Sequence, residues 1–435
     1  MTHWLLSLEL IDNPVMVIVP RIAFVVLLAF VVLARPVRFR RVAIGAVLGA
    51  VILWVTAAVL EHEGTFDGPL PRLAMLWGVC AGLGIGAGVV AVLSRPWARR
   101  LAGIVLILVS ILVGTLGVNR AYGITHTFAA LLGVQAYDVV PLPAATPAAG
   151  ADDGADLYKT WVAPADMPAH GQVSALGGSE RIPFGNFPKA RDGALYLPPA
   201  ALVAHPPALP LLVFMMGQPG GPDPTHLATA LDAFAAAHHG LAPIAIVADQ
   251  LGAPDLDPVC RDSSRYGAVS TYLNTLVPQY AQAHLNITAD HSRWVIGGYS
   301  NGGACAFAFA AAHPDLWGGL LDISGNEYPG SEHVSHTVAE LFGGDKAAFE
   351  AAMPTAQLAA HPGAYAGHPA VFTWGTEDPT FGPGQKRNAD AARAAGFNVA
   401  AIPIAGAGHV GTALTGGLDA AIQALGPAIG LAPPG

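Results

Sequence analysis

Charge is scarce in this sequence. Only 12% of its 435 residues are Asp, Glu, Lys or Arg, and 53% are apolar. A soluble domain carries about 25% charged residues. A single soluble globule is therefore excluded, and part of the chain is expected to lie in lipid.

Lysine is absent from residues 1–120, which contain ten arginines and five acidic residues, a balance of +5. The remaining 315 residues carry eleven basic and 25 acidic residues, a balance of −14. Two physically different parts are joined here, which agrees with a length of roughly 150 residues per domain. Because phosphates need a basic footprint, the acidic part argues against nucleic acid as a partner.

Four apolar runs in the first part are long enough to cross a bilayer, which takes roughly 20 residues. Three of them, 42–60, 73–94 and 101–119, contain no charge, whereas the first is interrupted by Pro20 and Arg21. A removable signal peptide is the alternative for this first run. The region before it is acidic, however, and no small-residue cleavage site follows. We therefore expect membrane-spanning helices over about 14–34, 42–60, 73–94 and 101–119.

Arginine is concentrated in two of the short loops between these helices. The two loops hold Arg35, Arg38, Arg40 and Arg41, and Arg95, Arg99 and Arg100. Loops rich in Arg face the cytoplasm. The N-terminus and everything after residue 120 are then expected on the outer side of the cell membrane.

The segment that joins the two parts has its own composition. Residues 121–134 are moderately amphipathic, and residues 140–155 are rich in Pro, Ala, Gly and Asp. Such a stretch without periodicity is typical of a linker. The expected organisation is a transmembrane domain over 1–120, a connecting segment over 121–156 and a second domain over 157–435.

The second domain alternates short apolar runs with helical stretches. Strands are predicted over 194–197, 210–216, 243–248, 293–296, 319–324, 370–374 and 398–404. Predicted helices include 225–238, 266–283, 302–312 and 384–395. This alternation predicts a mostly parallel sheet with helices on both faces.

A G-x-S-x-G pattern, residues 298–302, lies within this alternation and places Ser300 at its centre. The pentapeptide alone is a weak signal. Here it follows the strand RWVIG and opens the small-residue helix GGACAFAFAAA, which is the strand–turn–helix that a nucleophile elbow requires. The glycines allow a strained turn on which the serine hydroxyl stands free, so Ser300 is the candidate nucleophile.

A serine hydroxyl needs a general base that is oriented by a carboxylate. In this type of fold the chain order is Ser, then acid, then His. Asp378 follows the strand AVFTW and is the predicted acid, with the adjacent Glu377 as the alternative. His409 lies in a Gly-flanked loop after the strand NVAAIPI and is the predicted base.

Acyl transfer also needs donors for the oxyanion of the tetrahedral intermediate. The strand over 210–216 ends in the Gly-rich turn Gly-Gln-Pro-Gly-Gly. The backbone N–H groups of Gln218 and of Asn301, which follows the nucleophile, are the predicted donors. The alternative for this sequence is an ordinary tight turn.

Histidines and cysteines give no sign of a metal site. His238, His239, His333 and His336 lack partners at metal-ligand spacing, and we expect neither a metal nor another cofactor. Of the three cysteines, Cys80 falls in a predicted span. Cys260 and Cys305 could form a disulfide in an oxidising extracytoplasmic space. Alternatively, Cys305 is simply packed in the elbow helix.

The stretch 266–325 carries a family resemblance. Its segments YGAVSTYLNTLVPQYAQAHLNIT, DHSRWVIGGYSNGG and AAHPDLWGGLLDISG resemble the esterase D branch of the α/β-hydrolase superfamily, which includes the mycolyltransferases. The resemblance covers about 157–425, although Met216 stands where many members carry His or Asp. Membrane-anchored members with four N-terminal spans are similar to the whole chain. The resemblance implies an α/β-hydrolase fold and a triad of Ser300, Asp378 or Glu377, and His409.

These observations together predict a membrane-anchored serine esterase on the outer side of the cell membrane. Because the domain is tethered close to the bilayer, we expect it to cleave acyl or aminoacyl esters of membrane or envelope lipids. An acyltransferase of the mycolyltransferase type, in which a sugar hydroxyl replaces water, uses the same triad and is an alternative. A non-catalytic envelope scaffold is the third hypothesis. The sequence leaves the oligomeric state open.

Overall fold

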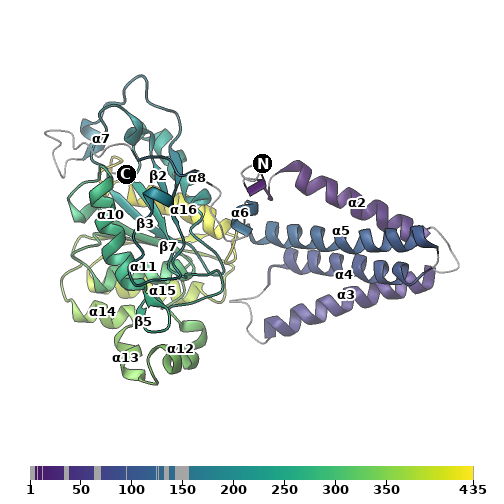
Figure 1. The fold of residues 1–435 in the computed structure, drawn as a ribbon. Coiled ribbons are helices and arrows are strands. Elements are labelled where there is room, and N and C mark those ends of the chain that lie inside the picture. Colours follow the sequence, from purple (N-terminus) through teal and green to yellow (C-terminus); the bar gives the residue numbers. More distant parts are fainter. Residues whose placement is uncertain are drawn as a thin grey trace. The chain divides into compact units, whose positions relative to one another are not determined.

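The structure is a computed structural model, and it forms two compact units, Met1–Leu132 and Gly133–Gly435 (Figure 1). The boundary falls inside the predicted connecting segment. The structure describes residues 5–6, 8–11, 13–33, 39–62, 70–94, 96–123, 125, 127–131, 137–142 and 156–434. Arg35, Arg38 and Arg95 and most of the predicted linker lie outside these residues.

The first unit is built on four long helices, α2 (Pro14–Leu33), α3 (Phe39–His62), α4 (Arg72–Val92) and α5 (Trp97–Tyr122). By length and composition, all four are able to cross a membrane. The predicted helices are thus confirmed as helices, whereas their insertion in a bilayer stays a prediction. Pro20 lies inside α2 without ending it. The short α6 (Phe128–Leu131) follows α5 within the predicted amphipathic segment.

Glycines bring α3 and α4 into backbone contact. A Cβ atom added at Gly49 would collide with the carbonyl oxygen of Gly82, and one added at Gly86 would collide with the carbonyl oxygen of Gly45. Residues of this size let membrane helices approach closely. These glycines of α3 and α4 therefore serve to pack the bundle.

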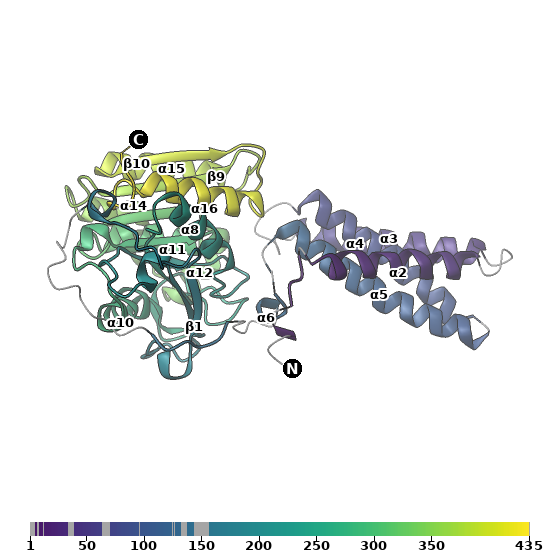
Figure 2. The ribbon, with the colours of Figure 1, turned by 90° about the horizontal axis from the view of Figure 1, so that it is seen from above.

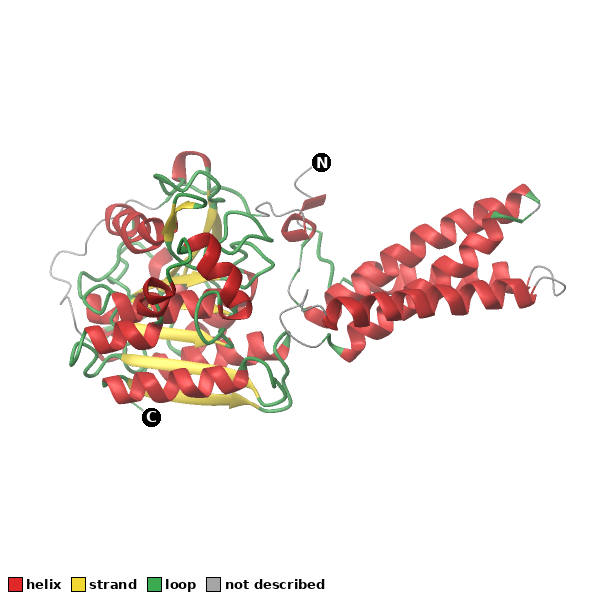
Figure 3. Ribbon diagram, turned by 90° about the horizontal axis from the view of Figure 1, so that it is seen from below, coloured by secondary structure: helices red, strands yellow, loops and turns green. Residues whose placement is uncertain are grey.

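The second unit contains a mostly parallel sheet of eight strands in the order β1-β2-β4-β3-β7-β8-β9-β10 (Figures 2 and 3). β3, β4 and β7 to β10 run parallel, and β1 and β2 form the antiparallel edge. The strands are β1 (Gln172–Leu176), β2 (Gly193–Leu197), β3 (Leu211–Met215), β4 (Ile244–Ala248), β7 (Val295–Tyr299), β8 (Gly319–Ile323), β9 (Pro369–Gly375) and β10 (Asn398–Ile404). Every residue of β3, β4, β7, β8 and β9 is buried, as expected for parallel strands covered on both faces.

Helices cover both faces of this sheet, which confirms the predicted layers. On one face α16 (Thr412–Leu425) packs on β9 and on α8 (Thr225–Ala237). On the other, α11 (Asn301–Ala312) packs on β7 and β8, α14 (Pro354–Ala360) lies beside it, and α15 (Gly382–Ala395) packs on α14 and β9. A separate hairpin of β5 (Asp262–Ser263) and β6 (Gly267–Ala268), with α12 (Val334–Leu341) and α13 (Lys346–Ala351), lies outside the sheet.

Two predicted elements had wrong boundaries, and one strand was not predicted. The helix predicted over 266–283 begins only at α9 (Val269–Thr271), continues as a π-helical turn over Tyr272–Leu276 and ends as α10 (Val277–His284). Pro278, which cannot donate a backbone hydrogen bond, accounts for the irregular turn before it. β7 runs three residues beyond the predicted Ile296 because Gly297 and Gly298, poor strand formers, are held by the neighbouring strands. β1 was missed, because its five residues carry no distinct pattern.

Candidate functional site

Ser300 occupies a strained turn between β7 and α11. Its φ is 54° and its ψ is −121°, a conformation that is unfavourable for a residue with a Cβ atom. A Cβ atom at Gly298 would collide with the carbonyl oxygen of Gly302, and one at Gly302 would collide with the carbonyl oxygen of Met215. Both glycines of the G-x-S-x-G pattern are therefore required sterically, and the predicted elbow is present.

The structure brings together the three residues predicted from chain order. Ser300 Oγ lies 2.9 Å from His409 Nε2, and His409 Nδ1 lies 3.0 Å from Asp378 Oδ2. Because Asp378 accepts from Nδ1, the Nε2 atom is left as an acceptor for the serine hydroxyl. The three side chains thus form one continuous chain of hydrogen bonds.

Burial distinguishes the two candidate acids. The Asp378 side chain is only 2% exposed, whereas Glu377 faces solvent. The second carboxylate oxygen of Asp378 accepts from the backbone N–H groups of Thr380 and Phe381. Burial by itself raises the pKa of Asp378, but the hydrogen bonds from His409 and from the backbone outweigh it and lower the pKa. The geometry therefore favours Asp378 over Glu377.

Two aromatic residues that the sequence did not single out hold the imidazole. The ring of Phe381 lies 4.2 Å from that of His409, and the ring of Tyr299 stacks on it at 5.8 Å. The Tyr299 hydroxyl also donates to the backbone carbonyl of His409 at 3.0 Å. Tyr299 immediately precedes Ser300, so its place beside the site is the one signal that could have found it.

The predicted oxyanion turn, residues 217–221, lies against the nucleophile. A Cβ atom added at Gly217 would lie 3.2 Å from the Cβ atom of Ser300. Among the described residues, the backbone N–H groups of Gln218 and Asn301 donate to no acceptor. Asn301 opens α11, where the first N–H groups of a helix have no partner within it. Both groups thus remain available to a ligand.

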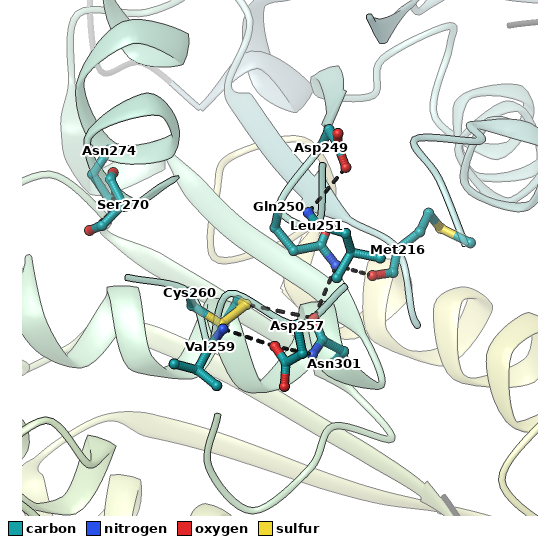
Figure 4. The surroundings of a disulfide bond; sticks show 11 residues. Met216, Asp249, Gln250, Leu251, Asp257, Val259, Cys260, Ser270, Asn274 and Asn301 are labelled. Carbon is teal, nitrogen blue, oxygen red and sulfur yellow. Dashed lines mark hydrogen bonds between the residues drawn. A yellow bond between two sulfur atoms is a disulfide. The ribbon is translucent and has the colours of Figure 1, made fainter. Parts of the chain in front are cut away.

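A disulfide joins Cys260 to Cys305, with 5.4 Å between their Cα atoms (Figure 4). The pairing left open by the sequence is therefore present, and Cys305 is not merely packed. Cys305 lies on α11 one turn after Asn301. The disulfide ties the residues that follow β4 to the helix that carries the nucleophile.

A cavity in this unit lies away from the triad. It has a volume of about 190 Å³ and lies along α11 beyond the disulfide, where Phe309, Phe342 and Phe349 line it. None of the three triad residues contributes to its wall. Within the described residues, no group of three or more His, Cys, Asp or Glu side chains is placed to hold a metal ion.

Comparisons with known proteins were made for sequence and for structure. No family model matches the chain. An uncharacterized protein of Corynebacterium glutamicum is 40% identical over 169 residues, which are 38% of this chain and 39% of that protein. The match therefore spans about two fifths of the length of that relative.

Solved structures similar to part of this chain include a hydrolase and an esterase. An S-formylglutathione hydrolase from Agrobacterium tumefaciens is 16% identical, with a TM-score of 0.48, over 61% of this chain and 98% of that one. An esterase from the archaeon Pyrobaculum calidifontis is 18% identical, with a TM-score of 0.39, over 63% and 90% of the two chains.

The observed sheet and side-chain geometry define a class of protein by themselves. A mostly parallel sheet, a strained serine after a central strand, and a Ser–His–Asp hydrogen-bond chain in that sequence order characterise the α/β serine hydrolases. Enzymes of this class act on carboxylic ester and related acyl bonds.

Proposed function

We propose that this protein is a membrane-anchored serine esterase that hydrolyses carboxylic esters. Ser300 is the nucleophile, His409 the general base and Asp378 the residue that orients the imidazole. The observation that carries the proposal is the unbroken hydrogen-bond chain from Ser300 Oγ through His409 to Asp378.

The reaction follows from this geometry in two acyl-transfer steps. Ser300 Oγ attacks the ester carbonyl carbon while His409 Nε2 takes its proton, and the N–H groups of Gln218 and Asn301 stabilise the oxyanion. The C–O bond then breaks, and the alcohol leaves with the proton from His409. A water molecule, deprotonated by His409, attacks the acyl-enzyme and releases the carboxylic acid and Ser300.

Three features support a location on the outer side of a membrane for this activity. Most of the exposed large apolar side chains, such as those of Val25 and Leu108, lie on α2 to α5, and an exposed apolar surface of this extent requires cover. The predicted loop arginines favour a cytoplasmic position for one end of the bundle and an outer position for the chain after α5, although four of them lie in the first turns of α3 and α5. The Cys260–Cys305 disulfide is in keeping with an oxidising outer compartment.

The proposed substrates are acyl or aminoacyl esters of membrane or envelope lipids. The support for this class is the tether itself, since the four candidate spans keep the hydrolase unit close to a bilayer. Transfer of the acyl group to a sugar hydroxyl instead of water uses the same residues. Product analysis with and without a sugar acceptor separates the two reactions.

The direct test is covalent labelling together with ester turnover in the full-length protein. A fluorophosphonate probe is expected to label Ser300, and Ser300→Ala is expected to lose both labelling and the turnover of p-nitrophenyl esters. Ser324→Ala, a buried serine of the same unit outside the triad, is the matched control. Turnover that persists unchanged in Ser300→Ala would contradict the proposal. Lipid profiling of membranes with wild-type or Ser300→Ala protein then identifies the ester that accumulates.

A further inference from the structure

One side-chain amide contacts both sides of the proposed oxyanion hole. Gln250 follows β4 and is 3% exposed. Its amide nitrogen donates to the carbonyl oxygen of Met216 at 2.5 Å and to Asn301 Oδ1 at 3.2 Å (Figure 4). Met216 precedes the turn that carries Gln218, and Asn301 carries the second predicted donor. Gln250 therefore links the end of β3 to the start of α11.

The residues after Gln250 hold the same two elements. Asn301 Nδ2 donates to Asp257 Oδ1 at 3.2 Å, so the Asn301 side chain is held at both its oxygen and its nitrogen. The backbone N–H of Gly220, in the oxyanion turn, donates to the carbonyl of Pro254 at 3.3 Å. We call residues 249–260 the β4 loop, and its last residue, Cys260, is bonded to α11 through the disulfide.

A buried ion pair fixes the first residue of the β4 loop. The Asp249 side chain is fully buried, and Arg191 contacts its two oxygens at 3.0 Å and 2.7 Å. The remaining terminal nitrogen of Arg191 donates to the carbonyl of Gly220 at 2.8 Å. The oxyanion turn is thus held at Met216, which precedes it, and at both backbone groups of Gly220. Gln250 and Pro254 of the β4 loop make two of these contacts, and Arg191, the ion-pair partner of Asp249, makes the third.

We propose that Gln250 is a positioning residue that sets the spacing between the two oxyanion donors, the N–H groups of Gln218 and Asn301. The inference rests on the proposed function. Oxyanion donors act at about 2.7–3.1 Å from the oxygen of the tetrahedral intermediate and not from that of the bound substrate. A shift of the turn relative to α11 therefore destabilises the transition state more than the ground state. Loss of Gln250 lowers kcat and leaves KM nearly unchanged.

The test uses the full-length enzyme in detergent micelles with a p-nitrophenyl ester. Active sites are counted by titration to completion with a phosphonate, so that misfolded protein does not contribute. Gln250→Met keeps the size of the side chain and removes its donor. Its kcat is expected to fall by about 10- to 100-fold. This fall is no larger than the fall of about 100- to 1000-fold that follows removal of a whole oxyanion donor. The Ki of a boronic acid inhibitor, which mimics the tetrahedral intermediate, is expected to rise in parallel while KM stays within about twofold.

A second variant covers the case in which Gln250→Met does not fold. Gln250→Glu has the same shape, and its carboxyl can donate to the Met216 carbonyl only when it is protonated. The ratio of its kcat to that of the wild type is expected to rise as the pH is lowered from about 8.5 to 5.5. A purely packing role would leave this ratio constant with pH, and that result would overturn the inference.

A control at a half-buried amide separates this role from a general loss of hydrogen-bonded amides. Asn274 donates to the backbone carbonyl of Ser270 and accepts from the Trp317 indole, and neither partner belongs to the site. Asn274→Asp is expected to keep kcat and the boronic acid Ki. An unchanged kcat in Gln250→Met, with Ser300-dependent turnover in the wild type, overturns the inference and leaves the proposed function intact. A wild type without Ser300-dependent turnover overturns both.

Discussion

The Nε2 atom of His409 lies 2.9 Å from the Oγ atom of Ser300, although the two residues are 109 positions apart in the chain. Ser300 follows β7 and His409 follows β10, and both strands belong to the parallel part of one sheet. The carboxyl ends of parallel strands share one edge of a sheet, where open α/β sheets bind their ligands. This relationship sets which substitutions are expected to impair catalysis.

The choice of acid is tested by a pair of isosteric substitutions. Asp378→Asn removes the acceptor that orients His409 and is expected to lower kcat by about 10⁴-fold, because the wrong imidazole tautomer then faces Ser300. Glu377→Gln changes an exposed neighbour and is expected to stay within about twofold of the wild type. The measurement is steady-state ester turnover for both variants. The opposite order of effects would assign the acid to Glu377.

Asp322 predicts a pH dependence of stability that is independent of the triad. Burial raises its pKa to about 7, and hydrogen bonds from Gln385 and from the Gly325 N–H offset this only in part. The folded state then keeps a proton that the unfolded state loses near pH 3.8. The free energy of unfolding therefore falls as the pH rises from about 4 to about 7.

Asp322→Asn removes this titration. Its Tm is expected to fall less between about pH 5 and pH 8 than that of the wild type. Asp419→Asn, which changes an exposed carboxylate on α16, is the control and is expected to follow the wild type. Equal pH dependence in the wild type and Asp322→Asn would show that Asp322 ionises normally in the folded state.

The disulfide is expected to contribute substantially to stability. It links residues 45 positions apart, and closing a loop of that length in the unfolded chain corresponds to about 4 kcal/mol. The double substitution Cys260→Ala with Cys305→Ala is expected to lower Tm, and a reductant should then lower the Tm of the wild type only. Cys80→Ala, which removes the free cysteine of α4, is the control. A reductant-insensitive wild type would contradict the disulfide.

The glycine contact between α3 and α4 predicts a position-dependent effect in the bundle. A side chain at Gly82 would collide with the backbone of Gly49, whereas no atom lies within 4 Å of a Cβ atom at Gly78. Gly82→Leu is expected to destabilise the bundle by about 1–3 kcal/mol, and Gly78→Leu is the matched control. SDS titration of the protein in mild-detergent micelles measures the difference. Equal midpoints for the two variants would exclude the contact.

Local sequence patterns predict much of the fold and identify the nucleophile. Hydrophobic length predicts the four helices of the first unit, because a span requires about 20 apolar residues in a row. The alternation of apolar runs predicts the parallel sheet. Ser300 is identifiable because its strained turn requires small residues on both sides, and these leave a five-residue pattern. Each of these signals lies within one segment of the chain.

Contacts between distant segments leave no such pattern. Asp378 and Glu377 are neighbours with the same chemistry, and only burial beside His409 distinguishes them. Gln250 and Arg191 contact Met216 and Gly220 at the predicted oxyanion turn from other parts of the chain, so neither stands in a motif. The pairing of Cys260 with Cys305 likewise depends on the path of the β4 loop.

The sequence by itself determined the division into an apolar, Lys-free part and an acidic α/β part, the serine turn, and the order of the triad. These depend on composition and on steric demands within a few residues. The tertiary structure alone decided which carboxylate meets His409, whether the cysteines pair, and what holds the oxyanion turn in place. The physical reason is that burial and hydrogen-bond distance arise only when strands far apart in the chain are brought to one edge of the sheet.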